Sequence, residues 1–190
     1  MPSHVALLRG INLGGHKKVA MADLRAVVAS LGHDDVATYI QSGNVVFSTD
    51  QADNAALADA IERAVASQLG VESRVLVLSR ADLAQVARDN PYPGEPNPRA
   101  VHVVFLSAEP SPEMVTSLAE VLAKVAVKRS RDTAQYAGRA LFLHTPDGFG
   151  RSELAVQLGR GRGPMSAQGA GTARNWATVT KLLALCDAAG

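Results

Sequence analysis

Val36-Ala-Thr-Tyr-Ile-Gln-Ser-Gly-Asn-Val-Val-Phe-Ser48 carries the pattern that decides the fold of this chain. β-Branched and aromatic residues lie on both sides of the turn dipeptide Ser42-Gly43, which is typical of two strands joined by a tight turn. We therefore predict a β-hairpin whose strands cover 36–40 and 45–48.

The segments on either side of this hairpin predict one helix and one strand each. Apolar residues recur at helical spacing at 21–31 and at 57–69, and each run is followed by a glycine that suits a left-handed helix cap. Short apolar strands are predicted at 4–8 and 74–78. The order β-α-β-β-α-β is that of a ferredoxin-like fold, an antiparallel sheet with both helices on one face. Ser79-Arg-Ala-Asp82 then predicts the start of a third helix through a capping-box-like pair.

The second half of the chain repeats the beginning of this plan. Residues 90–98 contain four prolines and one glycine, which disfavour helix and sheet interior and predict a domain boundary. A strand at 101–106, a helix that begins at Ser111-Pro112 and a hairpin around Gly138-Arg139 follow. We predict an α+β protein with an N-terminal ferredoxin-like lobe at 1–90 and a C-terminal α+β lobe at 99–190.

A basic, glycine-rich segment and one more helix end the C-terminal lobe. Residues 159–171 contain five glycines together with Arg160 and Arg162, a composition that predicts a mobile loop. The final helix is predicted to begin near Ala173, with Thr172 as its N-cap. We expect this helix to pack back on the N-terminal lobe.

The overall composition bounds the class of protein. The single cysteine, Cys186, cannot form an intramolecular disulfide and suits a reducing compartment. The N-terminus lacks the features of a secretory signal, and no apolar run approaches the roughly 18 residues that span a bilayer. The sequence predicts a soluble, cytoplasmic protein without a membrane partner.

The charge is unevenly distributed along the chain. Residues 1–95 carry 8 Lys and Arg against 11 Asp and Glu, whereas residues 96–190 carry 11 against 7. Between Lys124 and Lys181 the ratio is 10 basic residues to 3 acidic ones. This asymmetry indicates an anionic partner for the C-terminal half or attraction between the halves, and a solvated basic face is the structural alternative.

Three motifs combine into a family pattern. His4-Val-Ala-Leu-Leu-Arg-Gly-Ile-Asn-Leu-Gly-Gly15, Thr38-Tyr-Ile-Gln-Ser-Gly-Asn-Val-Val-Phe47 and Thr172-Ala-Arg-Asn-Trp-Ala-Thr-Val-Thr-Lys-Leu182 together resemble the bacterial family called domain of unknown function 1697. The resemblance implies an α+β fold of two interlocked ferredoxin-like subdomains, and it implies no activity, substrate or cofactor. Its motif residues fall at Arg9, Gly10, Asn12, Gly14, Gly15, Gln41, Ser42, Gly43, Asn44, Thr172, Arg174, Asn175, Trp176 and Lys181.

Arg174 is the most informative candidate for a site. A cation in the first turn of a helix faces the positive end of the helix dipole, at a cost of roughly 0.3–1 kcal/mol. An anionic ligand would offset that cost, and so would an internal carboxylate or a cluster of carbonyl groups. We predict a cleft that binds a phosphate-bearing or otherwise anionic small ligand, lined by Arg9, Asn12, Gly14, Gly15, Lys17, Gln41, Ser42, Asn44, Thr172, Arg174, Asn175 and Lys181.

Two alternatives belong to other functional classes. One is a nucleic-acid-binding module that uses the basic C-terminal half, since ferredoxin-like sheets serve that role in other proteins. The other is a structural or interaction protein, in which the motifs only lock the two lobes together through buried hydrogen bonds. Taken by themselves, Ser42-Gly43-Asn44 is predicted to be a turn first of all, and Trp176 is predicted to be a core residue and not a stacking platform.

Several chemistries are disfavoured by the spacing of their residues. A nucleotide-binding P-loop needs Lys directly after its last glycine, whereas His16 follows Gly15 here. The five histidines are dispersed and lack the spacing of a metal site. The motifs contain no carboxylate, so charge stabilisation by Arg and Asn is the expected basis of any reaction, rather than a nucleophile or general acid–base catalysis.

Overall fold

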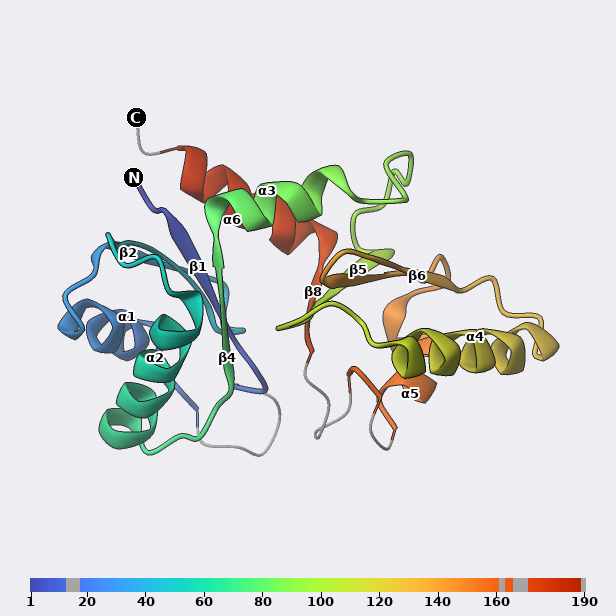
Figure 1. The fold of residues 1–190 in the computed structure, drawn as a ribbon, viewed down its shortest axis with the longest axis horizontal. Helices are drawn as coiled ribbons and strands as arrows, with labels where there is room; N and C mark the ends of the chain where they lie inside the picture. Colours follow the sequence, from blue (N-terminus) through green and yellow to red (C-terminus); the bar gives the residue numbers. More distant parts are fainter. Residues whose placement is uncertain (13–17, 161–162, 166–170, 189–190) are drawn as a thin grey trace. The chain divides into compact units, whose positions relative to one another are not determined.

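The computed structural model describes residues 1–12, 18–160, 163–165 and 171–188 (Figure 1). Two compact units divide the chain. Unit 1 contains Met1–Ala84 together with the chain from Lys181 onward, and unit 2 contains Gln85–Thr180. The last helix, α6 (Trp176–Asp187), therefore begins in unit 2 and ends in unit 1. This confirms the prediction that the C-terminal helix packs back on the N-terminal lobe.

Unit 1 is built on a four-stranded antiparallel sheet in the order β2-β3-β1-β4, here called sheet A. Its elements have the predicted order β-α-β-β-α-β. They are β1 (His4–Leu8), α1 (Met21–Ser30), β2 (Asp34–Tyr39), β3 (Asn44–Ser48), α2 (Asn54–Leu69) and β4 (Val75–Ser79).

Unit 2 repeats the plan around sheet B, whose order is β6-β7-β5-β8. Helix α3 (Arg80–Arg88) leads from unit 1 into unit 2. The remaining elements are β5 (Val101–Phe105), α4 (Pro112–Val127), β6 (Thr133–Ala137), β7 (Ala140–His144), the short 3-10 helix η1 (Phe149–Arg151), α5 (Glu153–Leu158) and β8 (Thr172–Asn175). The α+β class with two antiparallel sheets is confirmed.

Local side-chain contacts explain where the helices begin and end. The Asp53 carboxylate accepts the first free amides of α2, and Gly70 ends that helix in the left-handed conformation. The backbone N–H of Asp82 donates to Ser79 Oγ while the N–H of Ser79 donates back to the Asp82 carboxylate, which is the predicted capping box at α3. Ser111 caps α4, with proline at its first position.

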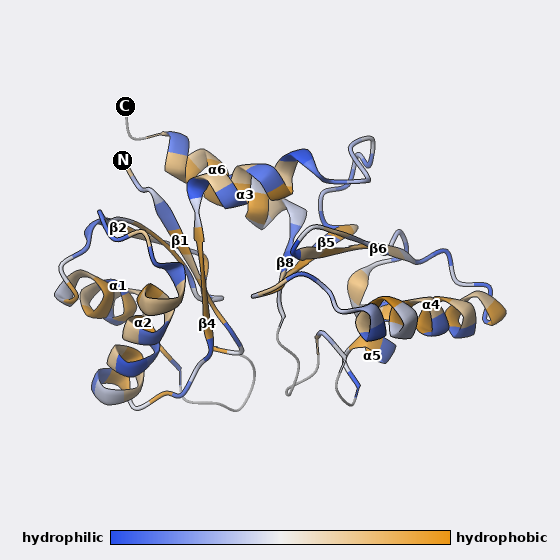
Figure 2. Cartoon of the chain, viewed as in Figure 1, coloured by the Kyte–Doolittle hydropathy of each residue, from blue (hydrophilic) through white to orange (hydrophobic). Residues whose placement is uncertain are grey.

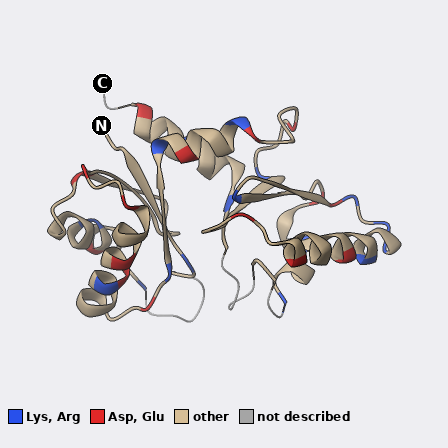
Figure 3. Ribbon diagram, viewed as in Figure 1, with Lys and Arg blue, Asp and Glu red and all other residues tan. Residues whose placement is uncertain are grey.

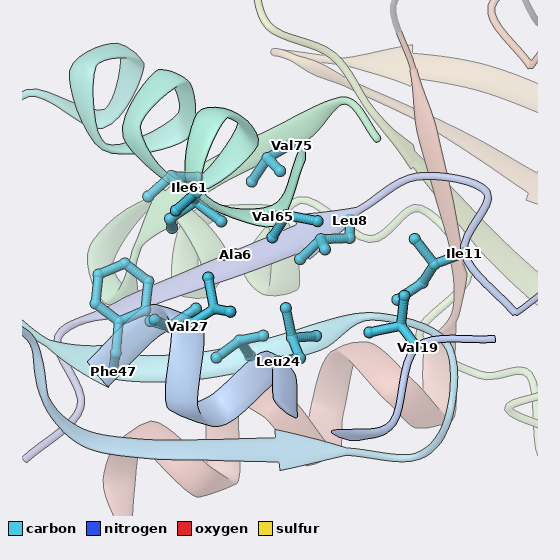
Figure 4. Packing of buried hydrophobic residues seen from close by; sticks show 14 of the residues in the cluster. Ala6, Leu8, Ile11, Val19, Leu24, Val27, Phe47, Ile61, Val65 and Val75 are labelled. Carbon is cyan, nitrogen blue, oxygen red and sulfur yellow. The ribbon is translucent and has the colours of Figure 1, made fainter. Parts of the chain in front are cut away.

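The core of unit 1 lies between sheet A and its two helices. Figure 4 shows Leu24 and Val27 of α1 and Ile61 of α2 against Ala6 and Leu8 of β1. Figure 2 shows that β4 is largely hydrophobic, whereas α1 and α2 carry both hydrophobic and hydrophilic residues, as helices that cover one face of a sheet do.

The core of unit 2 is formed in the same way. Leu118 and Val125 of α4 and Leu154 of α5 pack with Val104 of β5 and Leu141 of β7. In both units the helices therefore cover one face of an antiparallel sheet, as the ferredoxin-like plan requires.

The start of the last helix was predicted wrongly. Residues Thr172–Asn175 form strand β8, which pairs antiparallel with β5, and helix α6 begins at Trp176. Burial along β8 alternates with a period of two, with Thr172 and Arg174 buried. The segment gains the ladder hydrogen bonds of sheet B, and this tertiary pairing overrides the local helix pattern.

Parts of the predicted loop at 159–171 lie outside the described residues. Backbone bonds join its described parts: Met165 N–H donates to Leu158 O, and Gly171 N–H donates to Pro164 O. Within the described part of the chain, no helix combines the length and the apolar character that a membrane crossing requires.

Candidate functional site

The first two sequence motifs meet at one end of sheet A. The backbone N–H of Leu8, at the end of β1, donates to the carbonyl of Gly43 across 2.8 Å. Gly43 has φ +72, and a Cβ atom there would lie 2.8 Å from Leu8 Cβ and from Ile11 Cδ1. Only glycine fits this close approach, so the turn between β2 and β3 rests directly on the chain that follows β1.

Asn12 joins the two ends of the loop after β1. Its Oδ1 accepts the N–H of Val19 at 2.7 Å, while its Nδ2 donates to Val19 O at 3.0 Å and to Gln41 O at 2.9 Å. The backbone of Asn12 is left-handed, with φ 56. Both donors of the amide and one acceptor position are used by backbone groups, so Asn12 acts as a clasp between the two motifs.

Asn44 has a similar internal role in the hairpin. Its side chain is fully buried, and Nδ2 donates to Tyr39 O at 3.1 Å and to Ser42 Oγ at 2.9 Å. These bonds close the turn and orient the Ser42 hydroxyl. Gln41 is exposed and Ser42 is partly exposed, so both remain accessible from solvent.

Arg9 lies opposite Arg74 where β1 ends and β4 begins. The register that pairs Leu8 with Val75 continues by one step, because the N–H of Arg9 donates to Arg74 O at 2.9 Å. Ser73 Oγ donates to Arg9 O at 2.9 Å and to Arg74 O at 3.2 Å. Figure 3 shows basic residues at both strand ends. We call Arg9, Gln41, Ser42, Ser73 and Arg74 the strand-end surface.

Arg74 and Ser73 were missed as candidates by the sequence reasoning. The strand at 74–78 was predicted, and an antiparallel register with β1 would have placed its first residue against Arg9. That register depends on pairing across 65 positions of the chain, which no local pattern specifies. The Arg74 side chain is 84% exposed and contacts Glu62 Oε2 at 3.3 Å.

The third motif has a different geometry from the one predicted. Arg174 lies in strand β8, opposite Val103 of β5, and not in the first turn of a helix. The dipole argument for an anion at Arg174 is therefore wrong. Thr172 is buried at the start of β8 and is not a helix cap. Asn175 takes that place, because its Oδ1 accepts the N–H of Thr178 at 2.8 Å.

Arg174 is a buried cation. Only 9% of the residue is exposed, and Nη1 donates to Thr172 Oγ1 at 3.0 Å and to Ala173 O at 2.8 Å. Burial lowers the pKa of its guanidinium to about 10, so the group still carries its charge at neutral pH. Both of these acceptors lie within two residues of Arg174 on its own strand, so the contacts hold the guanidinium along β8.

The other predicted site residues are distributed as follows. Lys181 is exposed on α6, in unit 1, and Trp176 is partly buried with its ring 6.4 Å from that of Phe142. Gly14, Gly15 and Lys17 lie outside the described residues. Arg9, Asn12, Gln41, Ser42 and Asn44 belong to unit 1, whereas Thr172, Arg174 and Asn175 belong to unit 2. The convergence of the two groups on one ligand stays a prediction.

Ionisable groups elsewhere serve structural contacts. In the part of the chain that is described, no group of three or more His, Cys, Asp or Glu side chains gathers in a way that would hold a metal ion. Burial raises the pKa of the Cys186 thiol to about 11, so this group is a packing residue and not a reactive thiolate. Glu95 and His144 form a partly buried pair at 2.6 Å, against the ring of Tyr92.

Comparisons with known proteins support the fold, and one of them gives the family. The chain is similar in structure to the conserved bacterial protein SP0830 from Streptococcus pneumoniae, with a TM-score of 0.70 and 22% sequence identity over 97% of this chain and 98% of that one. This likeness supports the fold. A comparison with curated proteins found no match. The family model described as "Protein of unknown function (DUF1697)" matches residues 1–142. The chain belongs to this DUF1697 family.

Proposed function

We propose that this chain binds a phosphate-bearing or otherwise anionic small molecule at the strand-end surface. The observation that carries the proposal is the position of Arg9 opposite Arg74 across the ends of β1 and β4. Each guanidinium group can donate charge-assisted hydrogen bonds to a phosphate oxygen. Two arginines at adjacent strand ends therefore suit a ligand that carries several anionic oxygen atoms.

The ion pair of Arg74 leaves room for such a ligand. Its contact with Glu62 is formed by a largely exposed side chain at 3.3 Å, and exposed pairs of this kind contribute at most about 1 kcal/mol. Glu62 also accepts the N–H of Val75 at 2.8 Å, which fixes its carboxylate beside the start of β4. Glu62 therefore holds the Arg74 guanidinium beside the start of β4.

The polar neighbours suit a ligand with several oxygen atoms. The Ser42 hydroxyl is oriented by Asn44 Nδ2, and Gln41 presents an amide in solvent. Guanidinium groups bind phosphate oxygens with two parallel hydrogen bonds, which hydroxyl and amide donors can supplement. These groups bind and stabilise negative charge, and none of them is a nucleophile of the activated kind.

A structural role for the third motif is favoured by its own contacts. Arg174 is buried against Thr172 and Ala173, and Asn175 caps α6. We therefore assign this motif to the stability of the β8–α6 junction and not to the ligand. For this motif we therefore favour the structural alternative, in which the motif residues form buried hydrogen bonds and do not contact a ligand.

Nucleic-acid binding by the C-terminal half has less support. Phe105 and Phe142, the aromatic residues of the central strands of sheet B, are buried and offer no stacking surface. Two of the basic residues expected to contact phosphates are paired with acids, Lys128 with Glu153 and Arg131 with Asp147.

Thermal denaturation of the full chain tests the proposal. Inorganic phosphate and ribose 5-phosphate, at constant ionic strength, should raise the melting temperature of the wild type in a saturable manner. Arg9→Gln and Arg74→Gln should each weaken binding about tenfold, the loss expected for one charge-assisted contact. Arg63→Gln on the exposed surface of α2 is the matched control and should bind as the wild type does. No saturable shift with any phosphate compound, or an unchanged shift in Arg9→Gln, would overturn the proposal.

A further inference from the structure

Ile40 is held in an unfavourable backbone conformation and is half exposed to solvent. Its φ is +49, and half of the residue is exposed. The left-handed region brings Cβ close to the following carbonyl oxygen, and branching at Cβ makes this worse. A half-exposed isoleucine gains only part of the packing that would offset this strain. A glycine or asparagine would fit the turn better, so the local fold does not explain the isoleucine.

The surrounding hydrogen bonds force Ile40 into this conformation. Asn44 Nδ2 binds Tyr39 O on one side of it, and Asn12 Nδ2 binds Gln41 O on the other. Gly43, itself left-handed, then returns the chain to β3. Strain that is imposed by neighbouring contacts in this way is characteristic of functional positions.

The turn continues the strand-end surface across sheet A. The strands lie in the order β3-β1-β4, so Arg74, Arg9 and the turn before β3 occupy three neighbouring positions along one sheet end. Two steps between strands span about 10 Å. This length is comparable to that of a nucleoside monophosphate, from its phosphate to the far edge of its base.

We propose that the anionic ligand is a nucleotide, whose phosphate binds Arg9 and Arg74 and whose base contacts Ile40 and Gln41. This inference rests on the proposed function of the strand-end surface. The exposed Ile40 offers an apolar surface to the face of the base. The exposed amide of Gln41 carries a donor and an acceptor in one plane, which matches the hydrogen-bonding edge of a base.

Calorimetric titration with a graded set of ligands tests the inference. Wild-type protein should bind adenosine 5′-monophosphate at least about tenfold more tightly than ribose 5-phosphate, because the base adds buried apolar area. Ile40→Gly should remove most of that advantage and leave the affinity for ribose 5-phosphate unchanged. Gln41→Ala should reduce it to a smaller extent. Val127→Ala, at an 85% exposed valine of α4, is the control and should have no effect.

The melting temperature of the free variants separates function from folding. Ile40→Gly and Ile40→Asn relieve the left-handed strain, so both should melt no lower than the wild type, and Ile40→Asn serves if the glycine variant is unstable. An equal affinity for adenosine 5′-monophosphate and ribose 5-phosphate, or an unchanged preference in both variants, would overturn this inference. If the wild-type protein binds neither adenosine 5′-monophosphate nor ribose 5-phosphate, the proposed function itself is overturned.

Discussion

The backbone N–H of Arg9 donates to the carbonyl oxygen of Arg74 across 2.9 Å, so the last rung of the β1–β4 ladder holds two arginines opposite each other. Ser73 Oγ donates to both of their carbonyl oxygens. The backbone thus fixes the separation of the two residues, whatever their side chains bind. The turn that contains Gln41 and Ser42 lies at the same end of sheet A, because the N–H of Leu8 donates to Gly43 O.

Replacing Arg174 should cost stability and not ligand binding. Arg174→Gln removes the bonds that the buried guanidinium donates to Thr172 Oγ1 and Ala173 O, and we expect the free energy of unfolding to fall by about 3 kcal/mol. Urea denaturation measures this, with the exposed Arg99→Gln as a control that should change by less than about 0.5 kcal/mol. If Arg174→Gln is as stable as the wild type but is no longer stabilised by phosphate, Arg174 binds the ligand and the assignment to the strand-end surface is wrong.

The hydrogen bonds of the Asn12 amide predict that Asn12→Asp lowers the free energy of unfolding. Asn12→Asp keeps the acceptor for Val19 N–H but loses both donors, to Val19 O and Gln41 O, and we expect a loss of about 2 kcal/mol. Asn97→Asp is the matched control, because Asn97 uses only its Oδ1, as acceptor for Arg99 N–H. Equal effects of the two substitutions in chemical denaturation would show that the Asn12 amide donors are not needed.

Gly43 should tolerate no side chain, for two separable reasons. Gly43→Ala adds left-handed strain and a clash with Leu8 and Ile11, for an expected loss of about 2–4 kcal/mol. Gly138 has φ +51 but open space around its Cα, so Gly138→Ala should cost only the strain, about 1 kcal/mol. Similar losses in the two variants would contradict the close approach of the turn to the chain after β1.

Local signals in the sequence account for much of the fold. Gly70 ends α2, Ser79 and Asp82 start α3, and Ser111-Pro112 starts α4, each through contacts within a few residues. Such caps are readable because the partners are close in the chain. The hairpin around Ser42-Gly43 was predictable for the same reason.

Features that depend on distant pairing could not be predicted. Strand β8 exists because Thr172–Asn175 pairs with β5, about 70 positions earlier in the chain, and its four residues resemble a helix start when they are considered alone. The same limit hid Arg74, which becomes a candidate only when the register of β4 against β1 is known. Residues of the site that bind the backbone, such as Asn12 and Asn44, also cannot be told from ligand-binding residues by sequence.

His102 should make the protein sensitive to acid. Its Nδ1 is buried and, within the described part of the chain, has no hydrogen-bond partner, while its ring stacks on Phe149 at 4.0 Å. Burial lowers the pKa of His102 from 6.5 to about 4. In the unfolded chain His102 therefore binds a proton near pH 6.5, whereas in the folded chain it binds one only near pH 4. The free energy of unfolding consequently falls as the pH decreases from 6.5 to 4.

The expected loss from His102 is about 3 kcal/mol between pH 7.5 and pH 4. His102→Phe keeps a ring against Phe149, removes the buried nitrogen and should flatten this part of the pH profile. The difference between wild type and variant isolates the contribution from that of other groups. A difference in unfolding free energy that does not change with pH would show that His102 titrates normally in the folded protein.

An NMR titration with inorganic phosphate, followed by the backbone amides, tests the strand-end surface most directly. The account predicts saturable shifts at Arg9, Ser42 and Arg74 with one common dissociation constant, and none at the hairpin of β6 and β7. The absence of a saturable response at these three amides, or a response centred on Arg174, would contradict it.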